Sequence, residues 1–572
     1  MLIDEIQSAD KPSAAPDATS SAGIWDARIA PFCEKYFLLL SLLLIGIACA
    51  RVVLTYTALS ITPDEPTHFG CGLEYVANHD YKFETQHPPL SRAMQALGPY
   101  LAGVRPAGRA NPHDDALDAI AKVGHFDRIV FLMRLGNLPF FILACSVVCV
   151  WGRTFGAPIA ILALGLFTCL PTVLADAGLA TTDMALGATV GAAFLAAILW
   201  AQKPTMPRAI LLGLCGALAC LSKFTALGYL PAAGVLALAC YLVASWPGWR
   251  ELWGLAWRRA LTAPVAVAVT ALLIWAGYWF SIGPGLLRRG FHNHLPAPEF
   301  FDGIHVAMNH SHDGHGAFLL GHFSWTGWWY YFPVVLSLKT PIAFAILLVL
   351  GLLVCFNMRA RIIYLLPIAF CLGILLPAMN SHVDIGVRHI EPIYMGFSII
   401  AALGLKQLLQ WTRTGLACAL TAGALVAWLI ISVGVRHPDY LAYVNAFAGK
   451  SPEKMIVDSN YDWGQDLRIL SKVLQKRGVQ EVSLSVLNGV DRPELYKDWY
   501  GLPATQDVNV CIPSPGVNIV GPTIEKSLSY WSNAPRYYRG DHTPWYELAP
   551  PDERVGALLL FNIPPDSKLT CK

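Results

Sequence analysis

The apolar run "FLLLSLLLIGIACARVVLTYTALS" (37–60) is followed immediately by the polar stretch "ITPDEPTHFG" (61–70). A helix of about 20 apolar residues is long enough to cross a lipid bilayer. The whole chain has 572 residues, of which 55% are hydrophobic and 14% are charged, and its mean hydropathy is +0.47. The sequence therefore predicts a polytopic membrane protein, in which two acids and a histidine lie just beyond the first span.

About eleven transmembrane helices are predicted from runs of this kind. They are expected at 36–59, 129–151, 157–175, 184–201, 209–222, 225–245, 260–281, 331–356, 361–378, 390–408 and 416–435. If the N-terminus lies inside, every short inner loop is basic and the long or acidic loops, 60–128 and 282–330, lie outside. This distribution of Lys and Arg is the one that sets the orientation of membrane proteins.

The two ends of the chain differ from the membrane domain at 36–436. Residues 1–35 are expected to form a disordered cytoplasmic tail, because the stretch is polar and lacks the pattern of a cleavable signal peptide. Residues 437–572 are expected to form an extracytoplasmic α/β domain. Its predicted strands are "EKMIVDS", "QEVSLSVLN" and "RVGALLLFNI", and "GQDLRILSKVLQKRG" has helical spacing. Cys511 and Cys571 both fall in this domain, on the oxidising side, where a disulfide is expected.

The stretch "TPDE" has a purely structural interpretation. Thr62 would cap a helix, Pro63 suits the first helical position, and Glu65 would complete a capping box. Asp64 in the first turn would favour the helix dipole. Capping alone could therefore explain the motif, so its function has to be judged from residues elsewhere in the chain.

Further charged residues gather in the outer loops. Asp183 follows the third span, Lys223 lies in a tight turn, and "NSHVDIGVRHIEP" (380–392) carries Arg388 and His389. Lys339 lies inside an otherwise apolar span. Charges at membrane depth are costly and usually mark functional sites.

Attack on a sugar linked to a lipid phosphate would use these residue types. Asp64 would be the general base for the acceptor hydroxyl. Lys223, Lys339 and Arg388 would stabilise the anionic leaving phosphate. The chain has no P-loop or convincing dinucleotide fingerprint, and no basic stripe suited to nucleic acid.

At these residues the chain resembles the GT-C glycosyltransferases, and especially glycosyltransferase family 39, which includes protein O-mannosyltransferases and aminoarabinose transferases. Asp64-Glu65 is similar to the family's first-loop acidic pair, and "FETQHPPLSRAMQAL" to the helix and Pro-Pro stretch that follow it. "ATTDMAL", "LSKFTAL" and "IGVRHIEPIY" resemble the next acid, the lysine turn and the "GxRyxxPxy" segment. "GWWYYFPVVLSLKTP" and "SNYDWGQDL" also look like segments of bacterial members.

The resemblance implies an all-α GT-C fold with an outward-facing cavity, a polyprenyl-phosphate sugar donor and an inverting reaction. Asp64 would be the base, and Glu65 and Asp183 supporting acids. Lys223 and Arg388 would contact the phosphate. The chain departs from the aminoarabinose transferases at His87, where they have a lysine, and a neutral imidazole would bind phosphate more weakly.

Several other residues are possible parts of the site. His68 lies one turn after Asp64 on the same helix face, and His68, His87, Lys339 and His389 are predicted to contact substrate. No cofactor is assigned from the sequence, and no metal ligands are assigned. The histidines of the outer loop would allow a divalent metal, although such loops are more often solvated. They are His292, His294, His305, His310, His312, His315 and His322.

"DSNYDWGQDL" (458–467) has two interpretations of equal weight: a helix start capped by Ser459 or Asn460, or a contact with the acceptor or donor sugar.

The predicted function is therefore transfer of a sugar at the outer face of a bacterial inner membrane. The acceptor would be a protein, a lipid A-like glycolipid or a polysaccharide. Two alternatives are a lipid-linked sugar flippase and a membrane sensor or scaffold. A flippase would need polar residues through the whole bilayer depth, whereas here they cluster outside. A scaffold would not need the acid–base loops.

Overall fold

The computed structural model describes residues 25–284, 294–411, 415–487, 492–526 and 543–572. Most of the expected N-terminal tail, residues 1–24, lies outside the described residues. The rest of that tail is helical: a π-helical turn, Trp25–Ile29, leads into α2 (Ala30–Lys35). The side chain of Trp25 is buried in the core of the helical part, so the chain is already ordered before the first apolar run.

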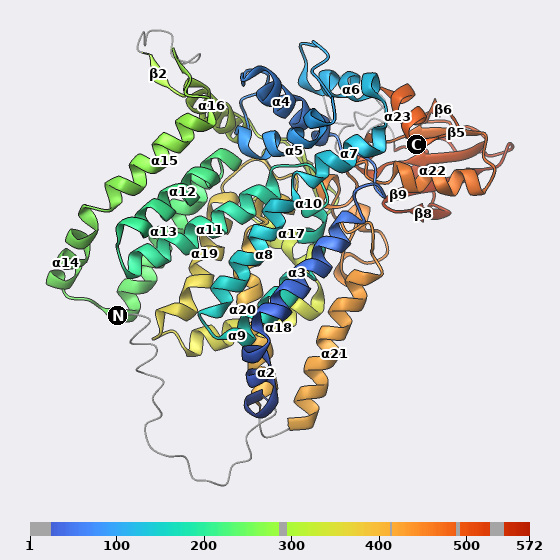
Figure 1. Ribbon diagram of the computed structural model, residues 1–572. Helices are drawn as coiled ribbons and strands as arrows, with labels where there is room; N and C mark the ends of the chain where they lie inside the picture. Colours follow the sequence, from blue (N-terminus) through green and yellow to red (C-terminus); the bar gives the residue numbers. More distant parts are fainter. Residues whose placement is uncertain (1–24, 285–293, 412–414, 488–491, 527–542) are drawn as a thin grey trace.

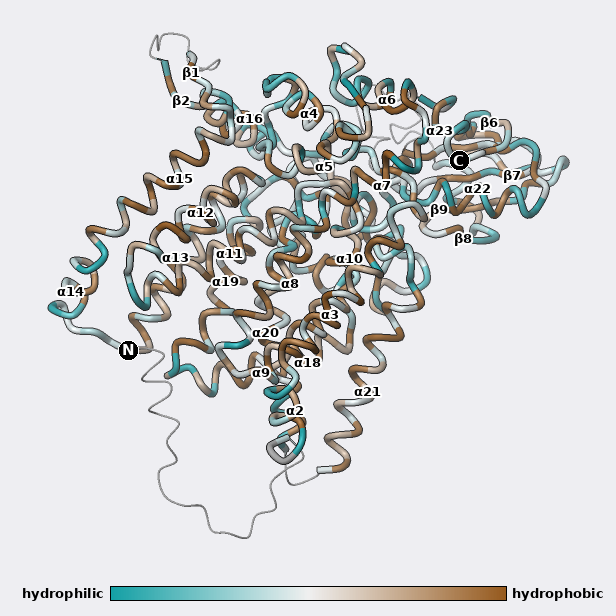
Figure 2. Tube along the Cα trace, viewed as in Figure 1, coloured by the Kyte–Doolittle hydropathy of each residue, from teal (hydrophilic) through white to brown (hydrophobic). Residues whose placement is uncertain are grey.

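A bundle of apolar helices forms the body of the protein (Figures 1 and 2). Each of the eleven predicted spans lies on one of these helices or on a bent pair of them. The unbroken helices are α3 (Phe37–Val53), α11 (Asp183–Gln202), α12 (Met206–Ser222), α13 (Ala226–Ser245), α19 (Ile362–Ala378), α20 (Ile393–Gln410) and α21 (Gly415–Gly434), with α7 (Phe126–Leu135) running into α8 (Leu138–Arg153).

Three bent pairs of helices lie in the bundle. Two of them carry the predicted spans 157–175 and 331–356, and in the third only the second helix carries a predicted span, 260–281. The pairs are α9 (Ala157–Phe167) with α10 (Pro171–Ala177), α14 (Trp249–Ala260) with α15 (Ala263–Gly277), and α17 (Tyr331–Lys339) with α18 (Ile342–Asn357), bent by 70°, 42° and 118°. A proline stands at or just after each break, where its missing N–H and its ring interrupt the helix.

Among the described residues, five helices are long and apolar enough to cross a membrane, or up to eight if each bent pair is one span. Three shorter apolar helices, α3, α12 and α19, account for the rest of the eleven predicted spans. The prediction of a mostly helical polytopic protein is confirmed, and the exact number of spans stays a prediction.

The first outer loop is helical and lies at the same end of the bundle as the C-terminal region (Figure 1). It contains α4 (Asp64–Asn78), α5 (Pro89–Leu101) and α6 (Pro112–Val123). The other large loop contains α16 (Pro298–Asp313) and two small hairpins, β1 (Ile282–Gly283) with β2 (Leu295–Pro296) and β3 (Ala317–Leu319) with β4 (His322–Ser324).

The C-terminal region holds a five-stranded sheet, as the predicted α/β character requires. Its spatial order is β6 (Ala504–Asp507), β5 (Glu481–Ser485), β7 (Gly516–Val520), β9 (Leu558–Ile563) and β8 (Glu553–Val555). β5 runs parallel to β6 and β7, and β9 runs antiparallel to β7 and β8. The helices of the region are α22 (Leu467–Lys476), α23 (Pro493–Tyr500), α24 (Pro522–Lys526) and α25 (Trp545–Leu548). The predicted disulfide joins Cys511 to Cys571.

Two of the three predicted strands and the predicted helix are confirmed, and "EKMIVDS" is not a strand. It lies across two short 3₁₀ turns, Pro452–Lys454 and Asp458–Asn460. Between the turns, Ile456 forms an isolated antiparallel bridge with Leu319 of β3. Ile456 and Val457 are both buried, so their apolar character reflects packing under the β3–β4 hairpin. The motif "DSNYDWGQDL" (458–467) is not a helix start capped by Ser459 or Asn460, because α22 begins only at its last residue, Leu467.

The C-terminal region and the first outer loop share one hydrophobic core. Phe69 and Leu117 of the loop belong to the same buried cluster as Leu470 and Leu560 of the C-terminal region. Phe126 stacks on Trp499 with 4.4 Å between ring centroids. This shared core fixes the C-terminal region against the loop that carries Asp64.

Candidate functional site

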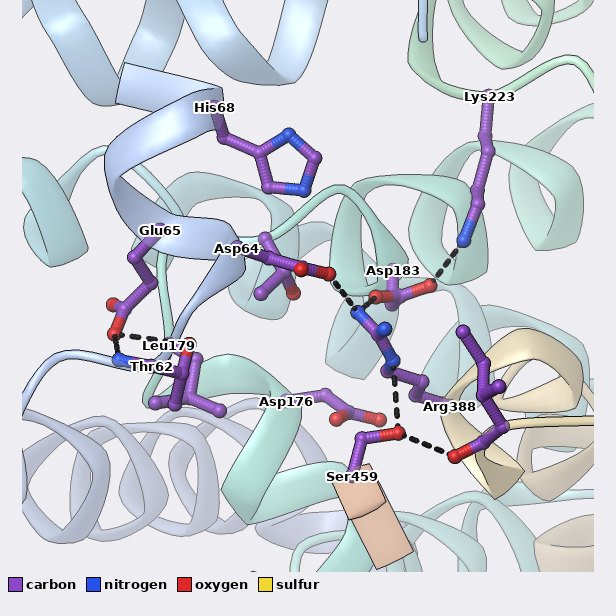
Figure 3. A network of polar contacts seen from close by, with 12 residues as sticks. Thr62, Asp64, Glu65, His68, Asp176, Leu179, Asp183, Lys223, Arg388 and Ser459 are labelled. Carbon is purple, nitrogen blue, oxygen red and sulfur yellow. Dashed lines mark hydrogen bonds and ion pairs between the residues drawn. The ribbon is translucent and has the colours of Figure 1, made fainter. Parts of the chain in front are cut away.

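The site begins at the first turn of α4, whose start the sequence placed one residue early. The residue before the helix is Pro63, and the Thr62 side chain does not cap it. The acidic half of the predicted capping box is present, because the Thr62 backbone N–H donates to Glu65 Oε2 at 2.8 Å. This turn leaves Asp64 on the side of α4 that faces the site (Figure 3).

Four predicted charged residues form one continuous chain of contacts (Figure 3). Arg388 Nη1 donates to Asp64 Oδ2 at 3.0 Å and to Asp183 Oδ2 at 3.5 Å. Lys223 Nζ donates to Asp183 Oδ1 at 2.6 Å. The two carboxylates and two cations thus alternate in space and balance in charge, although they come from positions up to 324 residues apart.

Each of these four residues stands at the end of a helix. Asp64 and Asp183 are the first residues of α4 and α11, and Lys223 follows the last residue of α12 in an extended conformation. Arg388 lies on the 3₁₀ turn Val387–Ile390 just before α20. A carboxylate at a helix N-terminus is favoured by the helix dipole, which helps to hold both acids in their ionised form.

Exposure separates the two carboxylates. The side chain of Asp64 is 40% exposed, whereas that of Asp183 is 1% exposed. Asp183 is therefore committed to binding the two cations, and Asp64 is the carboxylate that an incoming molecule can reach.

The charge of Arg388 controls the ionisation of Asp64. Burial acts to raise the pKa of Asp64, but the positive charge of Arg388, with its hydrogen bond, outweighs burial and lowers that pKa below its usual range. The same partnership raises the pKa of Arg388 above its ordinary value in spite of burial. Asp64 is thus a carboxylate at neutral pH, able to accept a proton but not to donate one.

His68 lies beside Asp64 on α4, as predicted, and is 4% exposed. Its Nδ1 accepts a hydrogen bond from Arg92 Nε at 3.1 Å, so a neutral His68 carries its proton on Nε2. Burial, together with the charge of Arg92, lowers the pKa of His68 to about 3. His68 is therefore a neutral hydrogen-bond donor at physiological pH.

His87 packs edge-on against His68, with 5.2 Å between ring centroids. Burial and the charge of Arg92 lower the pKa of His87 well below its usual range. Among the described residues, its buried Nδ1 has no hydrogen-bond partner. His87 is therefore a neutral group, unlike a lysine at this position. His389 is adjacent to Arg388 in the chain, and its buried Nε2 has no hydrogen-bond partner in the part of the chain that the structure describes.

Glu65 does not face the reactive side, so its predicted role as a supporting acid needs correction. It is fully buried and binds the guanidinium of Arg134 through both oxygens at 2.8 Å. It also accepts the backbone N–H groups of Thr62 and Ala180, each at 2.8 Å. Glu65 therefore joins the start of α4 to the loop before Asp183 and positions the two loops that carry Asp64 and Asp183.

Lys339 does not join the charged chain either, so its predicted phosphate contact needs correction. It is the last residue of α17, at the 118° break, and is 2% exposed. Its ammonium group donates to the backbone oxygens of Leu441, Tyr443 and Asn460 at 2.6, 2.7 and 2.6 Å. An ammonium has three donors, and here all three are used by the protein.

Sequence reasoning missed four residues that hold the site. Arg134 lies within a predicted transmembrane helix and Arg92 within the Pro-Pro segment, and neither was assigned to the site. Ser459 and Trp463 lay in a motif with two open interpretations. The only sequence signal for Arg92 and Arg134 was a positive charge beside apolar residues. Ser459 and Trp463 gave no such signal, because they contact Arg388 only in the folded chain.

The histidine-rich loop does not form a metal centre in the part of the chain that the structure describes. Nowhere in that part do three His, Cys, Asp or Glu side chains gather in a way that could hold a metal ion. His312 is exposed, and its Nδ1 lies 3.3 Å from Asp313. His292 lies outside the described residues.

Comparison with known proteins agrees with the predicted resemblance. The family model described as dolichyl-phosphate-mannose-protein mannosyltransferase matches residues 38–282. The match includes Asp64, Asp183 and Lys223, and Arg388 lies beyond it. No curated protein matches the sequence. The family match confirms the resemblance to GT-C glycosyltransferases, and with it the prediction that the chain is a membrane glycosyltransferase.

Two solved structures are similar in shape over most of the chain. ArnT from Cupriavidus metallidurans, bound to undecaprenyl phosphate, is 14% identical, with a TM-score of 0.49 over 91% of this chain and 97% of that one. The Archaeoglobus fulgidus oligosaccharyltransferase, tethered to an acceptor peptide, is 12% identical, with a TM-score of 0.48 over 84% of this chain and 60% of that one.

Proposed function

We propose that this protein transfers a sugar from a polyprenyl-phosphate donor to an acceptor hydroxyl at the outer face of a bacterial plasma membrane, with inversion and with Asp64 as the general base. The observation that carries the proposal is the pairing of Asp64 with Arg388. A partly exposed carboxylate lies within one hydrogen bond of a cation, and that cation shares Asp183 with a second cation, Lys223.

Asp64 can act as the general base because its carboxylate is ionised and its side chain is accessible to an acceptor. As the acceptor oxygen bonds to the anomeric carbon, its proton passes to the Asp64 carboxylate. His68 lies beside Asp64 and carries its proton on Nε2, which suits it to donate a hydrogen bond to a sugar or acceptor oxygen.

The two cations suit the leaving group. When the bond between the anomeric carbon and the phosphate oxygen breaks, the electron pair stays on the phosphate, which gains negative charge. Arg388 and Lys223 are the cations of the charged chain, and preorganised cations are most effective where charge develops. An entering phosphate would compete with Asp64 and Asp183 for these cations, and so would loosen the hold of Arg388 on the base.

A single displacement follows from the unequal exposure of the acids. A double displacement would need a second reachable carboxylate as a nucleophile. Asp183 is 1% exposed, and each of its oxygens accepts a hydrogen bond from a cation. Attack by the acceptor on the face opposite the phosphate would invert the anomeric centre.

The outer location rests on the loops that carry the site. The first loop and the C-terminal region lie at one end of the bundle, and the basic short loops are expected at the other. The disulfide between Cys511 and Cys571 suits an oxidising compartment. The family matched over residues 38–282 takes its name from a lipid-phosphate sugar donor and a protein acceptor, and protein, glycolipid and polysaccharide all offer a suitable hydroxyl.

The test is mass spectrometry of envelope glycans, glycoproteins and polyprenyl-phosphate sugars. The strains are wild type, a deletion, and the deletion carrying Asp64→Asn or Asp313→Asn at matched expression. Asp313 is the matched control, because its side chain is 77% exposed at the end of α16, outside the charged chain.

We expect one glycosylated product to disappear and one polyprenyl-phosphate sugar to accumulate in the deletion and Asp64→Asn strains, while Asp313→Asn restores the wild-type profile. These two species would name acceptor and donor together. A normal profile in the deletion strain would reject the transfer reaction. A normal profile with Asp64→Asn alone would reject Asp64 as the base.

A further inference from the structure

Arg388 is held from the C-terminal side by the motif whose function the sequence left open. Arg388 Nε donates to Ser459 Oγ at 3.1 Å, and Ser459 in turn donates to the Ile385 carbonyl oxygen at 2.9 Å. The ring of Trp463 lies under the guanidinium, 4.0 Å from its carbon, a cation–π distance. One edge and one face of the guanidinium are thus fixed by this segment, and Nη1 points to the carboxylates (Figure 3).

Asn460 fixes the backbone next to Ser459 from three directions. Its side-chain oxygen accepts the Val387 N–H at 2.8 Å, one residue before Arg388. Its side-chain nitrogen donates to the hydroxyl of Tyr331 at 2.8 Å, and its backbone oxygen accepts Lys339 Nζ at 2.6 Å. The turn that holds Arg388 is therefore tied both to the chain around Arg388 and to α17.

Lys339 extends the same tie to the start of the C-terminal region. Two of its three hydrogen bonds go to the carbonyl oxygens of Leu441 and Tyr443, and the third goes to that of Asn460. A buried ammonium is costly unless all of its donors are satisfied, so Lys339 favours the single arrangement in which these three carbonyls converge at the break between α17 and α18.

We infer that Lys339, Ser459, Asn460 and Trp463, together the Arg388 clamp, are positioning residues that set where the guanidinium of Arg388 stands between Asp64 and the donor phosphate. None of the four is assigned a contact with substrate. The inference rests on the proposed roles of Asp64 and Arg388. It gives the motif at 458–463 a third meaning, neither a helix start nor a sugar contact.

The physical reason for a clamp lies in the freedom of a long side chain. An arginine held only by carboxylates would lose its partner whenever an anionic substrate competed for it, and would then sample other rotamers. Ser459 contacts the Nε edge of the guanidinium, and the Trp463 ring contacts its face. A phosphate that binds at Nη1 would leave both contacts in place. Arg388 can therefore exchange Asp64 for phosphate while remaining where charge develops.

The decisive variant is Ser459→Ala, with Ser459→Thr as the conservative variant that keeps the hydroxyl. Ser146→Ala is the matched control, because its hydroxyl donates an exposed hydrogen bond to the Ile142 carbonyl oxygen within α8. Lys339→Met and Trp463→Phe are measured beside them. The readouts are melting temperature in detergent, affinity for polyprenyl monophosphate, and kcat/KM against pH with the donor and acceptor that the mass-spectrometry test names.

We expect Ser459→Ala to fold, to lower kcat/KM by about 10-fold, the scale of one hydrogen bond to a charged group, and to weaken binding of polyprenyl monophosphate. The acidic limb of its kcat/KM profile should move to higher pH, because a displaced Arg388 lowers the pKa of Asp64 less than a correctly placed one does. Ser459→Thr should restore all three values. Lys339→Met should move the limb in the same direction if it folds.

An unshifted acidic limb in folded Ser459→Ala would overturn the inference, as would equal losses in Ser459→Ala and Ser459→Thr. If Lys339→Met does not fold, Ser459→Ala still decides. Failure of the inference is distinct from failure of the proposed function. If Asp64→Asn is inactive and the acidic limb of Ser459→Ala does not shift, only the clamp is rejected. If Asp64→Asn is active, the role of Asp64 as the general base is rejected.

Discussion

Asp64 and Arg388 are joined by a hydrogen bond of 3.0 Å across 324 residues of sequence, and the arginine is far more deeply buried than the acid. The side chain of Arg388 is 7% exposed and that of Asp64 is 40% exposed. The cation is thus a fixed part of the framework, and the carboxylate is its accessible partner. In the proposed reaction this asymmetry would let the pair respond to an incoming anion as well as accept a proton.

The first prediction concerns the pH dependence of the reaction. Asp64 works as a base only when ionised, so activity should fall as pH falls through its pKa. In the free enzyme Arg388 lowers that pKa, and a bound donor phosphate opposes this effect. The acidic limb of kcat, which reports the substrate complex, should therefore lie at higher pH than the limb of kcat/KM, which reports the free enzyme.

The measurement is a pair of pH profiles with the purified protein in detergent or vesicles. The phosphodiester of the donor stays ionised over this range, so it adds no limb of its own. Coincident limbs for kcat and kcat/KM would show that the donor phosphate does not compete for Arg388.

The second prediction separates structural from catalytic acids. Glu65→Gln removes one partner of a fully buried ion pair and leaves Arg134 without its counter-charge. Breaking such a pair costs about 3–5 kcal/mol, so we expect a clearly lower melting temperature. Glu34→Gln is the matched control, because Glu34 pairs with Arg153 at a site where both side chains are about half exposed, and exposed pairs contribute little.

Asp64→Asn should have the opposite signature, with activity lost and the melting temperature nearly kept, because the Asp64 side chain is 40% exposed. Thermal melting and activity measured on the same preparations make the comparison. A Glu65→Gln protein with the wild-type melting temperature but no activity would show that Glu65 acts in the reaction and not only in folding.

The third prediction concerns the disulfide, which closes 60 residues of the C-terminal region. Cys511→Ser should destabilise this region by about 2–4 kcal/mol, because the cross-link restricts the unfolded chain. Reductant should have the same effect on the wild-type protein and none on the variant. Intact-mass thiol labelling without reductant should leave Cys511 and Cys571 unlabelled, and labelling of both would contradict the pairing.

The fourth prediction concerns stability in acid. Burial and Arg92 lower the pKa of His68 to about 3, whereas an unfolded chain takes up this proton near pH 6.5. The unfolded state therefore binds more protons between these values, and stability should fall as pH falls from about 6.5 toward 3. His68→Gln removes this contribution and should flatten the dependence of melting temperature on pH, and an unchanged slope would contradict the assignment.

Several features of the fold could be predicted because they depend on local composition. Long apolar runs, short basic loops and the alternation around Val482 and Leu560 each reflect a single segment and its surroundings. The break inside the span predicted at 331–356 also has a local cause. Pro341 follows Lys339 closely, and its ring and missing N–H allow a 118° break where hydropathy shows one continuous run.

The residues of the charged site could be predicted from the sequence, but their contacts with one another could not. Asp64, Asp183, Lys223 and Arg388 were recognised because ionisable residues beside membrane spans are rare and costly. Glu65 and Lys339 satisfied the same criterion and belong to other networks. A charge in a sequence shows that a partner must exist, but it does not identify the partner.

The sequence by itself determined the apolar helices, the polar loops between them, the C-terminal α/β region and the charges available for chemistry, since each follows from hydropathy, periodicity or residue type within a short window. Only the tertiary structure decided that Arg134 neutralises Glu65, that three carbonyls satisfy Lys339, and that Ser459 and Trp463 hold Arg388. These pairings join residues from 69 to 121 positions apart, so they depend on which helices pack together, and no local pattern records that choice.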